Sequence, residues 1–255
     1  DVYKRQEYMT PLVMMSQLEY ALAFYDTGHY NYKSVKDMLK KVAIHFVPMT
    51  NPDGVTLSQF GIDAIRSDSL KQGIRDCYTR DVTLKRTADS FETYLTKWKA
   101  NAAGVDLNYN FPYGWDELAT KLTEPSSASY KGPAPFSEPE SQALRTLVDQ
   151  YPWAVTVSYH SQGQVIYWTT SSNGAELASN TLAEAVSVMT GYRMDNSDGK
   201  GGFKDWMQSR SGAVPGVTLE VGKTPCPVPF AEFPEVWRQN KGVWVQVLDY
   251  VVRRI

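Results

Sequence analysis

The chain has 255 residues, of which 42% are hydrophobic and 21% are charged, a composition typical of a globular protein. Its 26 lysines and arginines against 28 aspartates and glutamates leave a net charge of −2 and no basic stripe, so we expect no nucleic-acid partner. No apolar run approaches the roughly 20 residues that cross a bilayer, so we also expect no membrane span.

The first expected element is a helix that ends near residues 26–28. Apolar residues recur at spacings of three and four along it, which predicts one apolar helix face. These residues are Leu12, Met15, Leu18, Leu22 and Tyr25. Thr10 followed by Pro11 is typical of a helix N-cap and the first helical position. Glu7 therefore stands where a strand would lead into a helix.

The stretch VAIHFVPM, residues 42–49, is short and nearly all apolar, which is typical of a strand covered on both faces in a parallel sheet. NPDG, residues 51–54, is predicted to be a turn because each residue type suits one. The sequence of residues 55–101 predicts helices and loops. Farther along, Ser137 with Glu140 three residues later predicts a capping box for the next helix.

The second half of the chain alternates between short apolar segments and amphipathic ones. Strands are predicted over 153–160, 164–168 and 216–222, a helix around 175–189, and a helical segment over 230–252 that is interrupted near Gly242. Because strands alternate with helices throughout, the predicted class is α/β. No internal repeat and no linker to a second domain is found.

His160 closes the strand WAVTVSYH. Alternation puts Thr156, Ser158 and His160 on one face, and ligand sites of open α/β sheets gather at the carboxyl ends of the strands. Two interpretations stay open. His160 is either hydrogen-bonded at the sheet rim, which position alone favours, or a metal ligand.

Glu220 lies in the apolar strand GVTLEVG, on the same face as Thr218. A glutamate in such a strand must be solvated, paired or functional. The strand is therefore either an edge strand with one wet face, or it carries a carboxylate that could act as a general base.

Cys77 and Cys226 lie far apart and show no C-x-x-C spacing, so they form no cysteine zinc site. One disulfide and two buried free thiols are both compatible with the sequence.

Five stretches, in this order, resemble the zinc carboxypeptidase family. They are VPMTNPDGV, WKANAAGVDLNYNFPYGW, VSYHSQGQVIYW, GGFKDW and PGVTLEVG. The similarity spans nearly the whole chain and looks closest to the bacterial branch that includes γ-D-glutamyl-diaminopimelate peptidases, which trim peptidoglycan stem peptides. The resemblance implies a mixed, largely parallel twisted sheet with helices on both faces. It also implies a peptide substrate and an enzyme that works on the cell wall or outside the cell.

The resemblance further implies one Zn²⁺, held in the family by an H-x-x-E motif and a second histidine. Glu7 and His160 match two of these ligands, and Glu220 matches the general base. Lys4 stands in the place of the first histidine, and an ammonium group is no zinc ligand. We therefore expect residues 1–6 to be a non-native start and residues 7–255 to form a single peptidase-like domain that lacks the family's first strands. We expect little or no peptidase activity from this chain itself.

The substrate-binding residues are also assigned by resemblance. The family pattern D-L-N-R-N-F reads DLNYNF here, so Asn108 is kept and Tyr109 replaces an arginine that binds the terminal carboxylate of the substrate. A phenol cannot offer the charged fork of arginine, which leaves carboxypeptidase and endopeptidase activity both open. Lys99 stands near the position at which the family keeps an arginine that polarises the scissile carbonyl.

Two other functions fit the sequence. One is a non-catalytic module that binds peptides or glycans and has lost its metal, which Tyr109 favours and the retention of Glu7 and Glu220 disfavours. The other is a zinc deacylase resembling aspartoacylase, against which NPDG and DLNYNFP favour a peptidase.

Overall fold

The computed structural model describes residues 7–118, 122–169, 175–196 and 199–255. Its main sheet has four strands in the order β3-β6-β4-β5. The strands are β3 (Thr156–His160), β6 (Gly216–Glu220), β4 (Val165–Tyr167) and β5 (Arg193–Asp195). β3 and β6 are parallel, as are β4 and β5, whereas β4 is antiparallel to β6. The expected α/β class with a mixed, largely parallel sheet is confirmed.

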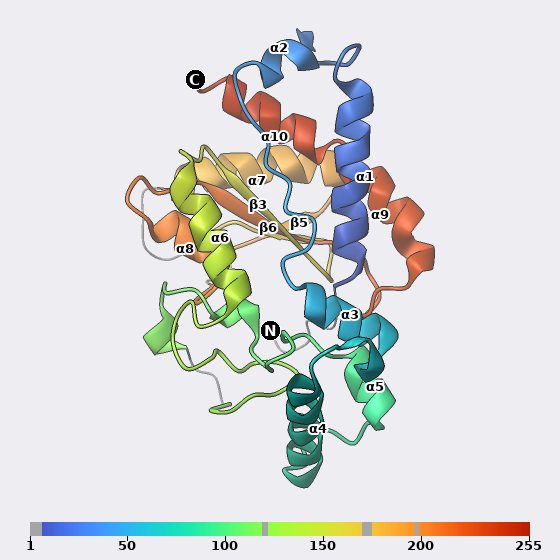
Figure 1. Cartoon of the computed structure of the whole chain (residues 1–255). Coiled ribbons are helices and arrows are strands. Elements are labelled where there is room, and N and C mark those ends of the chain that lie inside the picture. Colours follow the sequence, from blue (N-terminus) through green and yellow to red (C-terminus); the bar gives the residue numbers. More distant parts are fainter. Residues whose placement is uncertain (1–6, 119–121, 170–174, 197–198) are drawn as a thin grey trace.

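Helices cover both faces of this sheet (Figure 1). One layer holds α1 (Met9–Phe24), α7 (Glu176–Thr190), α9 (Phe233–Asn240) and α10 (Val243–Val252). Their apolar side chains pack with Val217, Leu219 and Val221 in the main core, and these three side chains are fully buried. The opposite layer holds α6 (Pro139–Gln150) and α8 (Phe203–Ser209). The polar side chains of β6 therefore face the α8 layer.

The remaining helices lie beyond the ends of the sheet. They are α2 (Val35–Leu39), α3 (Pro52–Phe60), α4 (Asp68–Thr83) and α5 (Phe91–Thr96). Single 3-10 turns are η1 (Ile62–Ala64), η2 (Leu107–Tyr109), η3 (Trp115–Glu117) and η4 (Phe230–Glu232), and β1 (His29–Tyr30) pairs with β2 (Lys33–Ser34) in a small hairpin. Helices α3 to α5 enclose a second core around Trp98, at the lower end of the view in Figure 1.

The predicted apolar face of the first helix is wrong, although the helix itself is present. α1 buries Met9, Val13, Gln17 and Ala21, whereas Leu22 is 69% exposed and Met15 and Tyr25 are exposed as well. Gln17 can be buried because its amide group donates to the Tyr159 hydroxyl at 2.8 Å and to the Asn240 carbonyl at 2.7 Å. Hydrogen bonds to distant residues thus decide which face is buried.

Three local predictions at helix starts are corrected. α1 begins at Met9, so Thr10 lies inside its first turn rather than at the N-cap. NPDG opens α3, with the Asn51 side chain accepting from the Gly54 N–H at 2.9 Å, and is not a turn between other elements. No capping box forms at α6, because the Ser137 hydroxyl instead donates to the Glu138 carboxylate at 2.7 Å.

Residues 42–49 form no strand, contrary to the prediction. The exposure of its side chains nevertheless alternates from residue to residue. No neighbouring strand pairs with it among the described residues, so the segment lacks the hydrogen bonds of a sheet.

The two cysteines are free and buried, which decides between the two interpretations of the sequence. The interruption near Gly242 is confirmed, because it separates α9 from α10. No helix within the described ranges is both long and apolar enough to cross a bilayer.

Candidate metal and catalytic site

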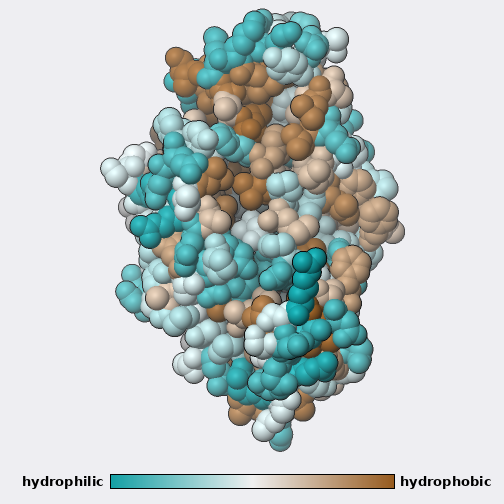
Figure 2. Space-filling model, viewed as in Figure 1, coloured by the Kyte–Doolittle hydropathy of each residue, from teal (hydrophilic) through white to brown (hydrophobic). Residues whose placement is uncertain are grey.

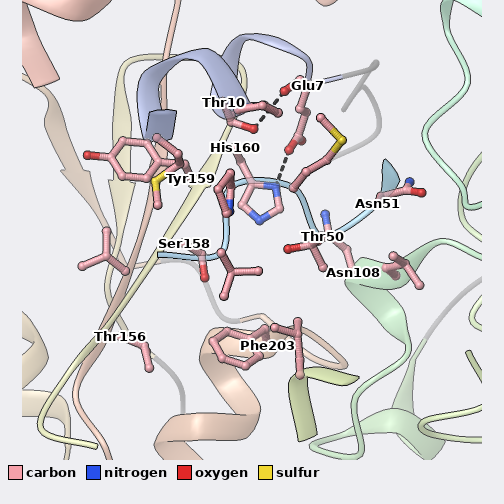
Figure 3. Close-up of a pocket in the computed structure, with 18 of the residues that line it drawn as sticks. Glu7, Thr10, Thr50, Asn51, Asn108, Thr156, Ser158, Tyr159, His160 and Phe203 are labelled. Carbon is pink, nitrogen blue, oxygen red and sulfur yellow. Dashed lines mark hydrogen bonds and ion pairs between the residues drawn. The ribbon is translucent and has the colours of Figure 1, made fainter. Parts of the chain in front are cut away.

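Two side chains from distant parts of the sequence meet at the carboxyl end of β3. His160 Nδ1 lies 2.7 Å from Glu7 Oε2, and only 20% and 17% of the two side chains are exposed. The turn that leads into α1 positions Glu7, since its carbonyl accepts from the Thr10 N–H at 3.0 Å and from the Thr10 hydroxyl at 2.9 Å. Figure 3 shows the Glu7 carboxylate directed at the His160 ring.

Glu220 lies beside this pair. His160 and Glu220 are register partners in the parallel ladder of β3 and β6. Partners in neighbouring parallel strands point to the same face, and the strands are about 4.8 Å apart. Glu220 is 1% exposed, and β6 lies between β3 and β4. The alternative of an edge strand with one wet face is therefore wrong.

The donor types of Glu7 and His160 fit zinc, whose ligands in proteins include imidazole nitrogen and carboxylate oxygen at about 2.0 to 2.2 Å. Their two donor atoms are close enough for both to bind one ion. A catalytic zinc site needs three protein ligands, and no group of three suitable side chains occurs among the residues that the structure describes. Lys4, which the sequence resemblance aligns with the first family histidine, lies outside the described residues. The pair thus fits part of a zinc site.

A pocket of about 280 Å³ opens in front of His160. The polar face of β3 supplies Thr156 and Ser158, as the alternation predicted, and Phe203 from α8 lies at the far end of the pocket (Figure 3). Lys99 and Asn108 line the pocket as well. Two of the three predicted substrate-binding residues therefore line the same pocket as the Glu7–His160 pair.

Lys99 is not free to act as an isolated cation. Its Nζ lies 2.5 Å and 2.7 Å from the two carboxylate oxygens of Asp106, and the two side chains are 11% and 2% exposed. Tyr109 does not line the pocket, and its ring centroid lies 5.3 Å from Lys99 Nζ, a cation–π distance. Tyr109 thus supports Lys99 from outside the pocket.

Asp106 is a residue that the sequence interpretation missed. Besides Lys99, its carboxylate accepts from the backbone N–H groups of Asn108 at 3.1 Å and Ser129 at 3.0 Å. It therefore fixes both the Lys99 side chain and the turn that carries Asn108. An aspartate two residues before the asparagine is the sequence signal of such a turn.

Cys226 is the second unexpected neighbour of the site. Its thiol lies 3.3 Å from the Ser161 hydroxyl. Burial raises the pKa of Cys226 to about 12, with a smaller contribution from the negative charges of Glu7 and Glu220. The side chain is thus a neutral thiol next to the acidic groups.

Comparison with known families decides what this site belongs to. A family model described as zinc carboxypeptidase matches residues 6–242, which is nearly the whole chain. The chain belongs to the zinc carboxypeptidase family. The resemblance drawn from the five sequence stretches is therefore confirmed, and the chain is a member of a hydrolase family.

Two bacterial proteins are similar to this chain over most of its length. The chain is 31% identical over 238 residues to the gamma-D-glutamyl-L-diamino acid endopeptidase 1 of Lysinibacillus sphaericus, an alignment that covers 92% of this chain and 56% of the relative. It is 28% identical over 257 residues to an uncharacterized protein, YqgT, of Bacillus subtilis, which covers 97% of this chain and 63% of the relative. The chain thus spans less than two thirds of the length of these curated relatives.

The fold also matches that of a solved structure. Bovine thrombin-activatable fibrinolysis inhibitor, solved in complex with tick carboxypeptidase inhibitor, superposes with a TM-score of 0.69 over 97% of this chain and 79% of that chain. The sequence identity is 15%, so this likeness concerns the fold alone.

Proposed function

We propose that the parent protein of this chain is a zinc-dependent peptidase that cleaves γ-D-glutamyl bonds to diamino acids in peptidoglycan stem peptides. The observation that carries the proposal is the contact between Glu7 and His160, with Glu220 as the register partner of His160. The substrate class is supported by the 31% identity to an endopeptidase named for that bond. Such a substrate would place the enzyme at the cell wall or outside the cell.

In this proposal Glu7 and His160 of the parent protein hold one zinc ion, together with a histidine at the position where this chain has Lys4. Zinc, when bound, supplies Lewis acidity. Lys4 stands where the family has its first histidine, and its ammonium group would repel the ion. With two of three protein ligands, this chain should bind zinc far more weakly than a complete site and show little peptidase activity.

The residues of the chain have distinct roles. Glu220 takes a proton from the attacking water and later returns it to the leaving amine, since both steps need one carboxylate beside the scissile bond. Lys99, held by Asp106, presents positive charge towards the developing oxyanion. Asn108, which lines the pocket, holds the substrate.

Tyr109 favours endopeptidase over strict carboxypeptidase activity. An arginine at this position would bind a free terminal carboxylate with two parallel hydrogen bonds. The phenol of Tyr109 cannot form these two hydrogen bonds, and Tyr109 does not line the pocket. Recognition in this chain therefore needs no free carboxyl terminus.

The test restores the metal site and then removes the base. Lys4→His, combined with the segment of the Lysinibacillus sphaericus relative that precedes the aligned region, should raise zinc affinity in calorimetry by several orders of magnitude. The restored protein should hydrolyse γ-D-glutamyl-diaminopimelate peptides, and Glu220→Gln in that background should abolish hydrolysis while leaving zinc affinity nearly unchanged. Hydrolysis of N-acyl amino acids in place of the stem peptides would identify a deacylase. Hydrolysis of the stem peptides by the unrestored chain would refute the proposed impairment.

A non-catalytic peptide- or glycan-binding module is the second candidate, and Tyr109 in place of arginine is the observation that favours it. This function predicts that the unaltered chain binds stem peptides in the presence of a chelator. Glu220→Gln should then leave the affinity unchanged, whereas Asn108→Ala should weaken it.

A further inference from the structure

Among the described residues that line the pocket, Lys99 is the one lysine or arginine, and its charge is already matched. Its Nζ contacts both carboxylate oxygens of Asp106, so two of the three N–H donors of the ammonium group are used. Glu7, beside His160, adds a further acidic group to the same lining. The described part of the pocket therefore offers no unmatched positive charge to an anionic group of a ligand.

Three neutral polar side chains of the same pocket are available for hydrogen bonds. They are Thr50, which is exposed, and Asn108 and Ser158, which are partly buried (Figure 3). None of these side chains makes a hydrogen bond within the described part of the chain. A hydroxyl group both donates and accepts, and so does a primary amide. The groups that can bind a ligand here thus form a neutral set of donors and acceptors.

The backbone next to Thr50 is fixed against that of Lys99. Thr50 directly precedes Asn51, the N-cap residue of α3, and the Asn51 side chain donates to the carbonyls of Lys99 at 3.2 Å and Ala100 at 3.0 Å. Figure 2 shows that hydrophilic atoms predominate in the lower half of the view, where Figure 1 places α3 to α5, whereas hydrophobic atoms gather in the upper half. Thr50 is therefore held at the hydrophilic end of this face.

The bond that the proposed function assigns to this site places a second carbonyl group close to the reaction. A γ-glutamyl bond leaves the α-carboxyl group of the glutamyl residue as a branch only a few bonds from the scissile carbonyl. This branch is either an ionised carboxylate or a neutral carboxamide. Moving an unpaired carboxylate out of water costs far more than moving a hydrogen-bonded neutral amide. The charge of the pocket lining therefore decides which of the two forms is accepted.

We propose that Thr50, Asn108 and Ser158 select a substrate whose glutamyl residue carries an α-carboxamide in place of the α-carboxylate. This inference rests on the proposed function and adds the chemical form of the substrate to it. A carboxamide can donate to a hydroxyl oxygen and accept from the Asn108 amide group, whereas a carboxylate can only accept. The neutral lining thus satisfies both halves of a carboxamide and gives a carboxylate no counter-charge.

The test compares two synthetic peptides on the intact chain, in the presence of a chelator so that no hydrolysis occurs. Both are L-Ala-γ-D-Glu-L-Lys with the same fluorescent label at the amino terminus. They differ only at the glutamyl α-carboxyl group, which is a carboxylate in one peptide and a carboxamide in the other. Fluorescence anisotropy at physiological ionic strength should show that the carboxamide peptide binds about tenfold more tightly or better.

A matched pair of charge substitutions locates the selectivity. Thr50→Lys adds an unmatched ammonium group at an exposed position of the pocket, so it should tighten binding of the carboxylate peptide by about tenfold and remove the preference. Thr83→Lys makes the same change in net charge at an exposed position of α4 that does not line the pocket, and it should leave the preference unchanged. Asn108→Ala should weaken binding of the carboxamide peptide more than that of the carboxylate peptide.

The outcomes separate this inference from the proposed function. Equal affinities of the two peptides for the unaltered chain, or tighter binding of the carboxylate peptide, would overturn the inference and leave the proposed function standing. Loss of the preference in Thr83→Lys as well as in Thr50→Lys would overturn it too, because net charge alone would then set the ratio. If neither peptide binds, the inference fails together with the substrate class of the proposed function.

Discussion

Asp106 binds Lys99 through both carboxylate oxygens, at 2.7 Å and 2.5 Å, and both residues line the pocket that contains His160. The same carboxylate caps the turn that carries Asn108. One buried acidic residue therefore organises both Lys99 and Asn108.

Asp106→Asn should destabilise the protein strongly, because it leaves the ammonium group of Lys99 buried without its counter-charge. We expect a loss of about 3 kcal/mol in the free energy of unfolding, measured by urea denaturation. The matched control is Glu117→Gln, which breaks the exposed ion pair with Lys200 and should cost less than about 1 kcal/mol. Equal effects of the two substitutions would contradict the structural role of Asp106.

Trp206 supports the far end of the pocket from α8. It is 6% exposed and stacks on Phe111 at 5.6 Å, with Phe136 at 5.1 Å and Phe203 at 5.9 Å. Trp206→Ala should lower the free energy of unfolding by about 3 to 5 kcal/mol, because it removes a large buried side chain and leaves a cavity. Phe60→Ala, at a position that is 72% exposed, should change it by less than about 0.5 kcal/mol in the same assay.

The free energy of unfolding should depend on the ionisation of Asp249 at acidic pH. Burial alone would raise the pKa of Asp249, but hydrogen bonds from Lys33, Asn31 and Arg253 hold it below its ordinary value. A depressed pKa means that the stabilisation is complete above the pKa of the unfolded chain, about 3.9, and is lost as the pH falls through the lower pKa of the folded state. Asp249→Asn should therefore cost about 1 to 3 kcal/mol at pH 7 and less at pH 3.

Urea denaturation at the two pH values measures this difference. Asp63→Asn, at an exposed position, is the control and should have no effect beyond about 0.5 kcal/mol at either pH. A cost of Asp249→Asn that stays constant from pH 7 to pH 3 would contradict the assigned hydrogen bonds.

The two cysteines should be unreactive in the folded protein. Burial raises the pKa of Cys77, and it raises the pKa of Cys226 to about 12, so both remain protonated at neutral pH. Because the thiolate is the reactive form, iodoacetamide at pH 7.5 should label neither residue without denaturant and both in urea. Mass spectrometry counts the labels, and rapid labelling of Cys226 in the folded chain would show that the site is open to solvent.

Much of the site could be predicted because it depends on local alternation. The period of two in TVSYH and GVTLE places His160 and Glu220 at equivalent ends of two strands, and the structure pairs them in register. The family resemblance supplied Glu7, since nothing in QEYMT itself indicates that its carboxylate reaches His160.

The errors come from contacts between residues far apart in sequence. The buried face of α1 depends on hydrogen bonds from Gln17 to Tyr159 and Asn240, which a count of apolar residues cannot include. Residues 42–49 have the composition of a buried strand, but pairing needs a neighbour that the described chain does not supply. Asp106 was missed for another reason, since its importance depends on the side chain of Lys99, seven residues earlier, which the sequence alone does not place.

The parallel ladder between β3 and β6 has a consequence for how the family can vary. Because His160 and Glu220 are joined through backbone hydrogen bonds of adjacent strands, their separation is independent of the loops that follow each strand. Insertions in those loops can reshape the entrance to the pocket and leave the two groups at the same spacing. A shift of the ladder by a single residue would instead turn one side chain to the opposite face of the sheet and separate the two groups.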